Sequence, residues 1–218
     1  VEIPGRFTVV RKDNEDELVV YLNSDAMDDK LQVFDGDYVE LIAKKRRSTV
    51  VMVMTDDDLA DTEVGVSDDL LKNLGIKEKK KFLGLTVRAG GARDGEGNMT
   101  APERPEFLTL KQAHPVNLNR AELAVVEETL GPITMARVQE EVIAPYFAQA
   151  DQPRVIKKGD LIKMGRGVWV KVMALTPKRG KDKFGKVVTA EGPEQTTVQV
   201  MPQPISQEDS EADLNAIG

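Results

Sequence analysis

The chain of 218 residues has no cysteine, a single histidine and a single tryptophan. Without cysteine it cannot form disulfides or use a thiolate, which fits a reducing compartment without requiring one. Because His114 is the only histidine, neither a histidine-rich metal site nor a Ser-His-Asp arrangement can be assembled. These absences exclude several common classes of catalytic site.

Positive charge is also in deficit. Lysine and arginine total 30 against 37 acidic residues, a net charge of −7. This balance argues against binding driven by neutralisation of nucleic-acid phosphates and favours basic protein partners. The basic clusters at 44–47 and 77–81 lack the interleaved aromatic residues of a base-stacking surface. The first is more simply a hairpin tip whose charges discourage aggregation between strand edges.

No apolar run approaches the length of a membrane span, and the first residues, VEIPGRF, do not read as a secretion signal. The first residue is not methionine and the last residues are linker-like. We therefore expect a piece of a longer protein, with enough residues for one large or two small domains.

Two Gly-Asp pairs are the most informative local pattern. Gly36-Asp37 precedes an apolar run at 38–43, and Gly159-Asp160 precedes a second run at 161–164. Glycine can supply a positive-φ turn, and the aspartate can accept hydrogen bonds from nearby backbone N–H groups before a strand begins. With further β-type runs at 18–22 and 49–55, the pattern predicts a small barrel of interleaved strands.

Elsewhere the sequence predicts short helices, strands and one long loop. Ser67 can cap a helix with an apolar face of Leu70, Leu71 and Leu74, which Gly75 can end. A second helix is expected from Thr134, with Pro145 limiting its extension. Glycines and prolines predict an exposed, mobile loop over about 90–116. Further strands are expected at 82–87, 122–126, 160–164, 168–175, 185–190 and 196–200.

Apparent enzyme motifs are incomplete. The segment 180–186, GKDKFGK, approaches a phosphate-binding loop, but Val187 stands where Ser or Thr must bind magnesium. The residues that follow favour a strand where a helix N-terminus is required, so a hairpin turn is the simpler interpretation. The chain also lacks the Asp-Thr/Ser-Gly of aspartic proteases and the Gly-Ser pair of pyruvoyl decarboxylases. Its many carboxylates leave an acidic dyad open, but no pair stands out.

Three segments resemble one family in that family's own order. The run LQVFDGDYVELIAKKRRSTVVMVMTDDD at 31–58 resembles the N-terminal domain of the valosin-containing-protein family of hexameric AAA ATPases, also called transitional endoplasmic reticulum ATPases. The run APYF at 144–147, followed by IKKGD at 156–160, is similar to the second subdomain of that domain. The ending DLNAIG is similar to the segment before the first ATPase module. The resemblance is loose over about 77–122.

The resemblance implies a double-psi β-barrel followed by a four-stranded β-barrel, with a groove between them that receives adaptor proteins. In these relatives the adaptors are ubiquitin-fold domains of the UBX type and short Arg-rich helices. One groove wall is implied to contain Asp16, Val19, Phe34, Asp37 and Met52, and the other Ala148, Ala150 and Asp151. The apolar members can bury an anchor and the acidic ones can bind arginines. The alternative interpretation keeps Val19 and Met52 in the core and makes Asp37 a turn-stabilising residue.

Two residues depart from the family pattern. Asp35 stands where relatives usually have Arg, and Asp151 where they usually have Tyr. Both changes would make the groove more acidic and alter the choice of partner. Arg166 is implied to lie in the region that faces the ATPase ring.

The combined interpretation is a mostly β protein with short helices. We expect a barrel over 1–118 with an inserted loop at about 90–116, a small barrel over 119–200 and an acidic linker over 201–218. The expected function is to bind adaptors for an ATPase that extracts and unfolds ubiquitinated proteins. This ATPase is expected in the cytoplasm, and through its adaptors also in the nucleus and at the ER surface. The chain itself would hold no cofactor or metal and would catalyse nothing, since ATP and magnesium would bind in separate ATPase modules. The alternative is a free-standing double-psi barrel protein with enzymatic or nucleic-acid-binding activity.

Overall fold

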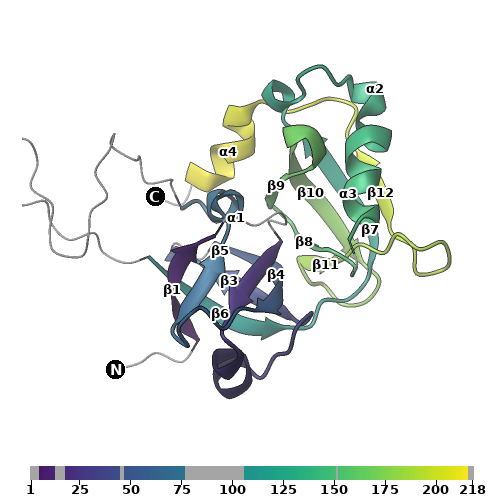
Figure 1. Ribbon diagram of the computed structural model, residues 1–218. Coiled ribbons are helices and arrows are strands. Elements are labelled where there is room, and N and C mark those ends of the chain that lie inside the picture. The colour runs from purple at the N-terminus through teal and green to yellow at the C-terminus, as the bar shows by residue number, and fades with distance from the viewer. Residues whose placement is uncertain (1–4, 13–17, 45–46, 77–105, 151, 216–218) are drawn as a thin grey trace, which may run out of the picture.

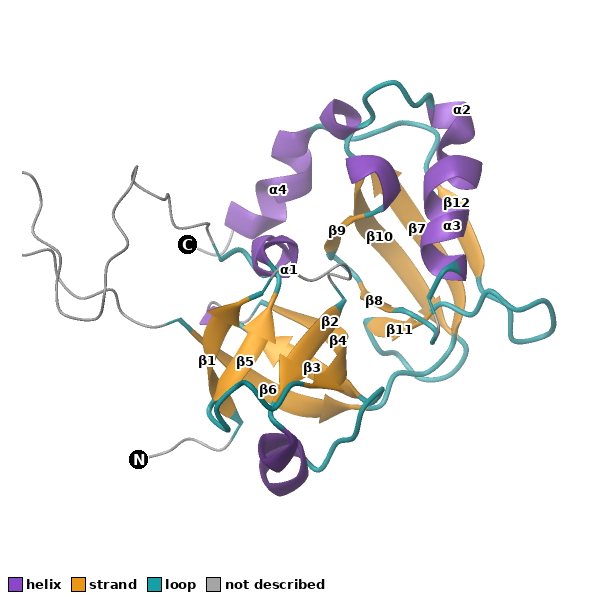
Figure 2. Ribbon diagram, viewed as in Figure 1, coloured by secondary structure: helices purple, strands orange, loops and turns teal. Residues whose placement is uncertain are grey.

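The computed structural model describes residues 5–12, 18–44, 47–76, 106–150 and 152–215. Figure 1 shows two β-rich subdomains side by side, joined through residues 114–117. Figure 2 shows that strands dominate both and that the helices are short. Among the described residues, no helix combines the length and the apolar character that a membrane span needs.

The first subdomain is a closed barrel of six strands in the order β1-β5-β2-β4-β3-β6. Strands β1/β5 and β2/β4 pair in parallel, and the other neighbours are antiparallel. This mixed closed barrel is compatible with a double-psi arrangement. The strands are β1 (Arg6–Arg11), β2 (Val19–Leu22), β3 (Tyr38–Ile42), β4 (Ser48–Thr55), β5 (Glu63–Val66) and β6 (Phe107–Ala113).

The second subdomain contains a four-stranded sheet and a two-stranded sheet. The four strands, in spatial order, are β12 (Thr197–Val200), β7 (Leu118–Val125), β10 (Trp169–Pro177) and β9 (Leu161–Lys163). The pair consists of β11 (Phe184–Lys186) and β8 (Val155–Lys157).

The helical elements are short. Among the helices whose bounds lie within the described residues, the π-helix Ala26–Leu31 and α1 (Asp68–Asn73) belong to the first subdomain and the others follow β7. These are α2 (Met135–Val138), a π-helix (Gln139–Ile143), α3 (Ala144–Ala148), α4 (Gln207–Asn215) and two 3-10 turns, Glu127–Thr129 and Gly165–Gly167.

Strand β4 shows how the two subdomains pack. Val51 and Val53 belong to the main hydrophobic core, whereas Val50 belongs to a smaller cluster with Tyr38, Ala113 and Val155. Since Val155 lies on β8, this smaller cluster lies on the boundary between the subdomains. Strand β4 is therefore covered on both faces, which explains its almost continuous run of apolar residues.

The structure corrects the expected loop at about 90–116. Residues 77–105, including the strand expected at 82–87, lie outside the described residues. Residues 107–113, however, form β6, which pairs with both β1 and β3 and closes the barrel. Leu108 and Leu110 are fully buried on it. The segment is a core strand because its apolar side chains alternate toward the barrel interior.

The helix ends differ in how well they were predicted. Ser67 caps α1 by accepting a hydrogen bond from the Leu70 N–H at 3.2 Å, and Gly75 has a φ of +71°, as expected. Pro145, however, does not end the second helix. A π-turn at Gln139–Ile143 precedes α3, and the helix continues to Ala148. Wider turns of this kind accommodate a residue that lacks an N–H donor.

The segment 201–218 was expected to be an acidic linker, and its described part contains α4. Ser210 on this helix is buried, and the Lys171 ammonium group donates to the Asp209 carbonyl oxygen at 3.4 Å. Helix α4 is therefore held against the second subdomain through its side chains and backbone.

Candidate partner-binding groove at the subdomain boundary

The turn before β3 is built as the sequence predicted. Gly36 has a φ of +86°, and an Asp37 carboxylate oxygen accepts a hydrogen bond from the Phe34 N–H at 2.9 Å. The Asp37 N–H in turn donates to the Phe34 carbonyl oxygen at 2.9 Å. Asp37 therefore stabilises the turn, as the alternative interpretation held.

This turn displays Phe34. Its side chain is 70% exposed, and it is the one exposed large hydrophobic residue in the described part of the chain. Its neighbours Val33 and Tyr38 are buried. Phe34 is thus not a core residue, and its apolar surface is available to a partner.

Asp35 contacts its own barrel. Its Oδ1 atom accepts hydrogen bonds from the Thr55 N–H at 2.6 Å and from the Thr55 hydroxyl at 2.7 Å. The side chain is nevertheless exposed. Asp35 thus helps to fix the turn against the end of β4 and contributes negative charge to the surface near Phe34.

A hollow of about 320 Å³ adjoins this turn. Its lining comes from the barrel, from the connection between the subdomains and from the second subdomain: Gly36, Asp37, Tyr38, Gln112, Ala113, His114, Pro115, Gln152 and Lys186. Of the implied groove residues that the structure describes, Asp37 lines this hollow, and the hollow lies at the boundary between the two subdomains.

Tyr38 joins the two walls of this hollow. Its hydroxyl donates to the Pro153 carbonyl oxygen at 2.9 Å, and the Lys186 ammonium lies 4.9 Å from the centre of its ring. Burial, and secondarily the charge of Asp37, raise the pKa of Tyr38 above its ordinary value. The phenol consequently stays protonated and keeps its role as a donor.

The other residues that the resemblance implies for the groove differ in how far they are buried. Val19 is buried and Met52 is half-buried, packed against the boundary cluster of Tyr38, Val50, Ala113 and Val155. Val19 pairs with Met52 and belongs to neither hydrophobic cluster, whereas Leu18 and Val20 belong to the main core. Val19 therefore lies covered on the outer face of the barrel and not in its interior, where the alternative interpretation placed it. Ala148 is exposed and Ala150 half-buried at the end of the second helix. Asp16 and Asp151 lie outside the described residues.

Sequence reasoning missed most of the residues that line the hollow, among them Gln112, His114, Gln152 and Lys186. Gln112 and His114 fell in the expected loop, and Lys186 was considered only as part of an incomplete phosphate-binding loop. Their proximity depends on the packing of the two subdomains, for which a local sequence pattern gives no signal.

The second Gly-Asp turn has the same local form and a different environment. Gly159 has a φ of +90°, and an Asp160 carboxylate oxygen accepts a hydrogen bond from the Lys157 N–H at 2.8 Å. Asp160 is only 3% exposed and also accepts from the Thr49 hydroxyl at 2.9 Å and the Asn73 amide at 3.2 Å. Thr49 and Asn73 belong to the first subdomain, so this cluster crosses the boundary.

Lys157 forms a second polar contact across the boundary. Its ammonium donates to the Glu40 carboxylate at 2.9 Å and to the Ser48 hydroxyl, which also donates to Glu40 at 2.7 Å. Burial would raise the pKa of Glu40, but the hydrogen bonds from Lys157 and Ser48 outweigh it and hold that pKa below its usual value. Glu40 therefore stays ionised and paired at neutral pH.

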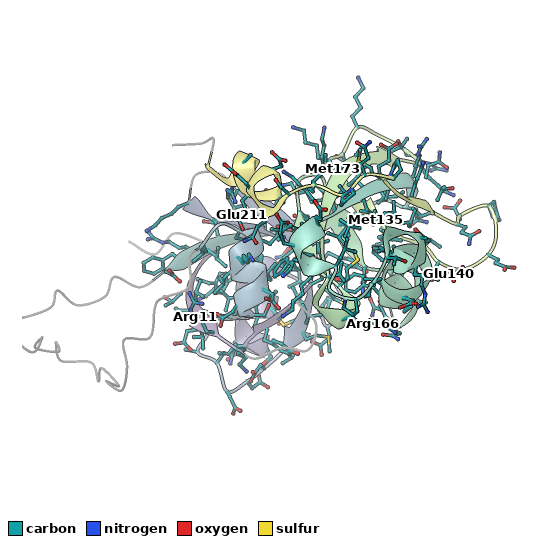
Figure 3. The ribbon with its side chains drawn as sticks, turned by 90° about the horizontal axis from the view of Figure 1, so that it is seen from above. Arg11, Met135, Glu140, Arg166, Met173 and Glu211 are labelled. Atoms are coloured by element: carbon teal, nitrogen blue, oxygen red, sulfur yellow. The ribbon has the colours of Figure 1, made fainter. Side chains whose placement is uncertain are left out.

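Arg166 lies in the turn between β9 and β10. It has a φ of +61°, is exposed, and forms an ion pair with Glu141 of the second helix. Figure 3 shows Arg166 close to the helix that carries Glu140. Its expected orientation toward an ATPase ring remains a prediction.

The segment 180–186 is not a phosphate-binding loop in form. It ends in β11, and a strand therefore stands where a helix N-terminus would be required. The expected hairpin needs correction, because β11 pairs with β8 and not with the preceding strand β10. Within the described ranges, no three His, Cys, Asp or Glu side chains are placed to hold a metal ion.

A comparison of the chain with models of known protein families finds no match. The class that the structure itself defines is a mostly β protein with a closed six-stranded mixed barrel and additional sheets.

Proposed function

We propose that this chain is an adaptor-binding module of the valosin-containing-protein type, in which a double-psi barrel and a small β-barrel present a groove to protein partners. The observation that carries the proposal is the exposed Phe34, displayed by the same turn whose Gly36 and Asp37 line the hollow at the subdomain boundary. An exposed aromatic side chain next to a concave surface is a common binding hot spot.

The surroundings of Phe34 fit a protein partner with an apolar anchor and basic side chains. Asp35 and Asp37 place carboxylates in the same turn as Phe34, and the chain is acidic as a whole. Carboxylates form strong, charge-assisted hydrogen bonds with arginine. UBX-type domains, Arg-rich helices and other cofactors of the ubiquitin pathway are therefore the proposed partners.

In this proposal the module recruits substrates for a hexameric ATPase that extracts and unfolds ubiquitinated proteins in the cytoplasm. ATP and magnesium would be bound by ATPase modules of the parent protein, and the module itself would contribute recognition only. The resemblance of the three sequence segments supports this, together with the barrel, the two Gly-Asp turns and the boundary hollow.

The test is binding of a purified UBX-type domain to the chain and to Phe34→Ala. We expect Phe34→Ala to weaken binding by about 1–3 kcal/mol, the range for losing a buried aromatic anchor. The melting temperature should change little, because Phe34 is exposed in the free chain. Calorimetric titration and thermal melting measure the two effects separately.

Phe34→Leu provides the matched control, since it keeps an apolar side chain at the same position and should retain part of the affinity. If neither variant changes the affinity, the partner does not use this surface. If the chain does not bind UBX-type domains or Arg-rich helices at all, the adaptor proposal is wrong and the free-standing barrel protein becomes the better interpretation.

A further inference from the structure

The buried polar contacts across the subdomain boundary centre on Asp160. We name the four residues Thr49, Asn73, Lys157 and Asp160 the Asp160 cluster. Three of its side chains are almost inaccessible: Thr49 is 0%, Asp160 3% and Asn73 8% exposed. Buried polar groups with several partners fix orientation, because a small displacement leaves a donor or acceptor unpaired.

The cluster is reciprocal across the boundary. Asp160 accepts from Thr49 of β4 at 2.9 Å and from Asn73 of α1 at 3.2 Å. The Asn73 side-chain oxygen accepts in return from the Leu161 N–H at 2.8 Å. One turn of the second subdomain is thus bonded to a strand and a helix of the first.

The remaining polar contacts on the α1 side of the boundary are more exposed. Lys163 pairs with Asp69 at 3.0 Å, and the Lys72 ammonium lies 4.3 Å from the centre of the Trp169 ring. Exposed ion pairs contribute little to stability. The relative orientation of the two subdomains therefore depends strongly on the hydrogen bonds of the Asp160 cluster.

The same cluster places an ionisable group in a buried position. Burial raises the pKa of Asp160 to about 6, although the hydrogen bonds from Lys157, Thr49 and Asn73 oppose the rise. The charge acting on it is Lys157 of β8, which itself pairs with Glu40 of β3. On α1, Asp69 and Lys72 contact Lys163 and Trp169, and on β10 Lys171 donates to Asp209 of α4.

The direction of the pH effect follows from linkage. A carboxyl group whose pKa is raised in the closed boundary stabilises that boundary most when it is protonated, below its ordinary value of 3.8. This contribution is lost as the pH rises through about 6. At neutral pH the closed boundary therefore contains a buried, ionised carboxylate.

We propose that the Asp160 cluster is a pH-sensitive latch that fixes the orientation of the two subdomains, and that loosening of this latch lets the hollow at their boundary adjust to a partner. The second half of this statement rests on the proposed function. The first half concerns the chain alone and is tested without a partner.

The test is the distribution of distances between spin labels on the two subdomains. Because the chain has no cysteine, Asp58→Cys and Lys181→Cys at exposed positions provide two unique labelling sites. His114→Gln is included in every version so that the chain contains no imidazole. Pulsed electron paramagnetic resonance then compares about pH 5 with about pH 8, on either side of the expected transition.

We expect a narrow distribution at the lower pH and a broader one, with a second population, at the higher pH. If opening exposes Asp160 fully to water, the closed-to-open ratio falls by on the order of 10-fold between about pH 5 and about pH 8, because the ratio falls about tenfold for each pH unit between the starting pH and the raised pKa of about 6. Asp160→Asn removes the ionisable group and should therefore give a distribution that does not change with pH. Thr49→Val removes one donor and should broaden both distributions while the pH dependence remains.

The latch is rejected if the wild-type distribution is the same at both pH values, or if Asp160→Asn retains the wild-type dependence. Should Asp160→Asn fail to fold, as judged by circular dichroism, Thr49→Val decides, since an unchanged distribution in that variant also rejects the latch. A pH-dependent distribution in a chain that binds neither UBX-type domains nor Arg-rich helices would support the latch and reject the proposed function.

Discussion

At the scale of single residues, the two Gly-Asp turns show how one local pattern serves two purposes. In both, glycine has a φ near +90° and the aspartate accepts a hydrogen bond from a backbone N–H three residues earlier. Asp37 is half-buried beside the groove, and Asp160 is buried beneath the boundary. The sequence predicted the turns from residue types alone, but it contained no local signal for this difference in burial.

The two glycines form a matched pair for a substitution test. An added Cβ at Gly36 would lie 2.6 Å from the Gln152 amide nitrogen, whereas nothing lies within 4 Å of one at Gly159. We expect Gly36→Ala and Gly159→Ala each to reduce the free energy of unfolding by about 1–2 kcal/mol, because both impose a left-handed conformation on a residue with a side chain. Chemical denaturation measures this cost.

The two variants should differ at Gln152. The contacted nitrogen lies at the end of the flexible Gln152 side chain, which lines the hollow. Gly36→Ala should therefore displace this side chain at little further cost in stability. The amide resonances of Gln152 should shift in Gly36→Ala and stay unchanged in Gly159→Ala. A Gly36→Ala variant as stable as the original chain would contradict the strained turn.

At the scale of elements, the sequence predicted strands with clear apolar runs and missed elements that depend on their neighbours. Strands β2, β3 and β4 and helix α1 agree with their predicted positions within a residue or two. Strand β6 was missed because its alternating pattern follows a stretch rich in glycine and proline. The second helix passes Pro145 because a π-turn, which residue types do not predict, removes the conflict.

The role of β6 is testable through its buried leucines. Leu110 is 2% exposed and lies opposite Leu41 in the pairing of β6 with β3. We expect Leu110→Ala to reduce the free energy of unfolding by about 2–5 kcal/mol, the usual cost of truncating a buried leucine. The neighbouring Lys111→Ala, at an exposed position, should change it by less than about 0.5 kcal/mol.

Urea denaturation of both variants provides the measurement. Equal, small effects of the two substitutions would mean that residues 107–113 do not form a core strand. The loop expected from the sequence would then be the better description of this segment.

At the scale of the whole molecule, the hollow is a product of packing between two subdomains that share one hydrophobic core. Residues far apart in sequence, such as Gly36, His114 and Lys186, line one hollow. Sequence reasoning predicted the turn that displays Phe34 because a turn depends on local residue types. It could not locate the opposite wall, because that wall is determined by how β6, β8 and β11 meet across the boundary.

The distribution of charge around this groove leads to a final prediction. The net charge is −7, and the exposed Asp35 lies next to Phe34. An Arg-rich helical peptide should therefore bind more weakly as salt rises, because exposed charges interact over a Debye length of about 8 Å at physiological ionic strength. Substituting Asp35 tests its share of this attraction.

Asp35→Asn is the informative substitution, because asparagine keeps an acceptor for the two Thr55 hydrogen bonds and removes only the charge. We expect it to weaken binding of the peptide at low salt by about 0.2–1 kcal/mol, the range for an exposed ion pair, and to make the salt dependence shallower. Glu127→Gln, which removes an exposed charge remote in sequence from the turn, should leave both unchanged. Fluorescence titrations of one labelled peptide at low and high salt measure affinity and slope together. If Asp35→Asn and the original chain give the same affinity and the same slope, Asp35 does not face the partner, and the acidic character of the groove must come from other residues.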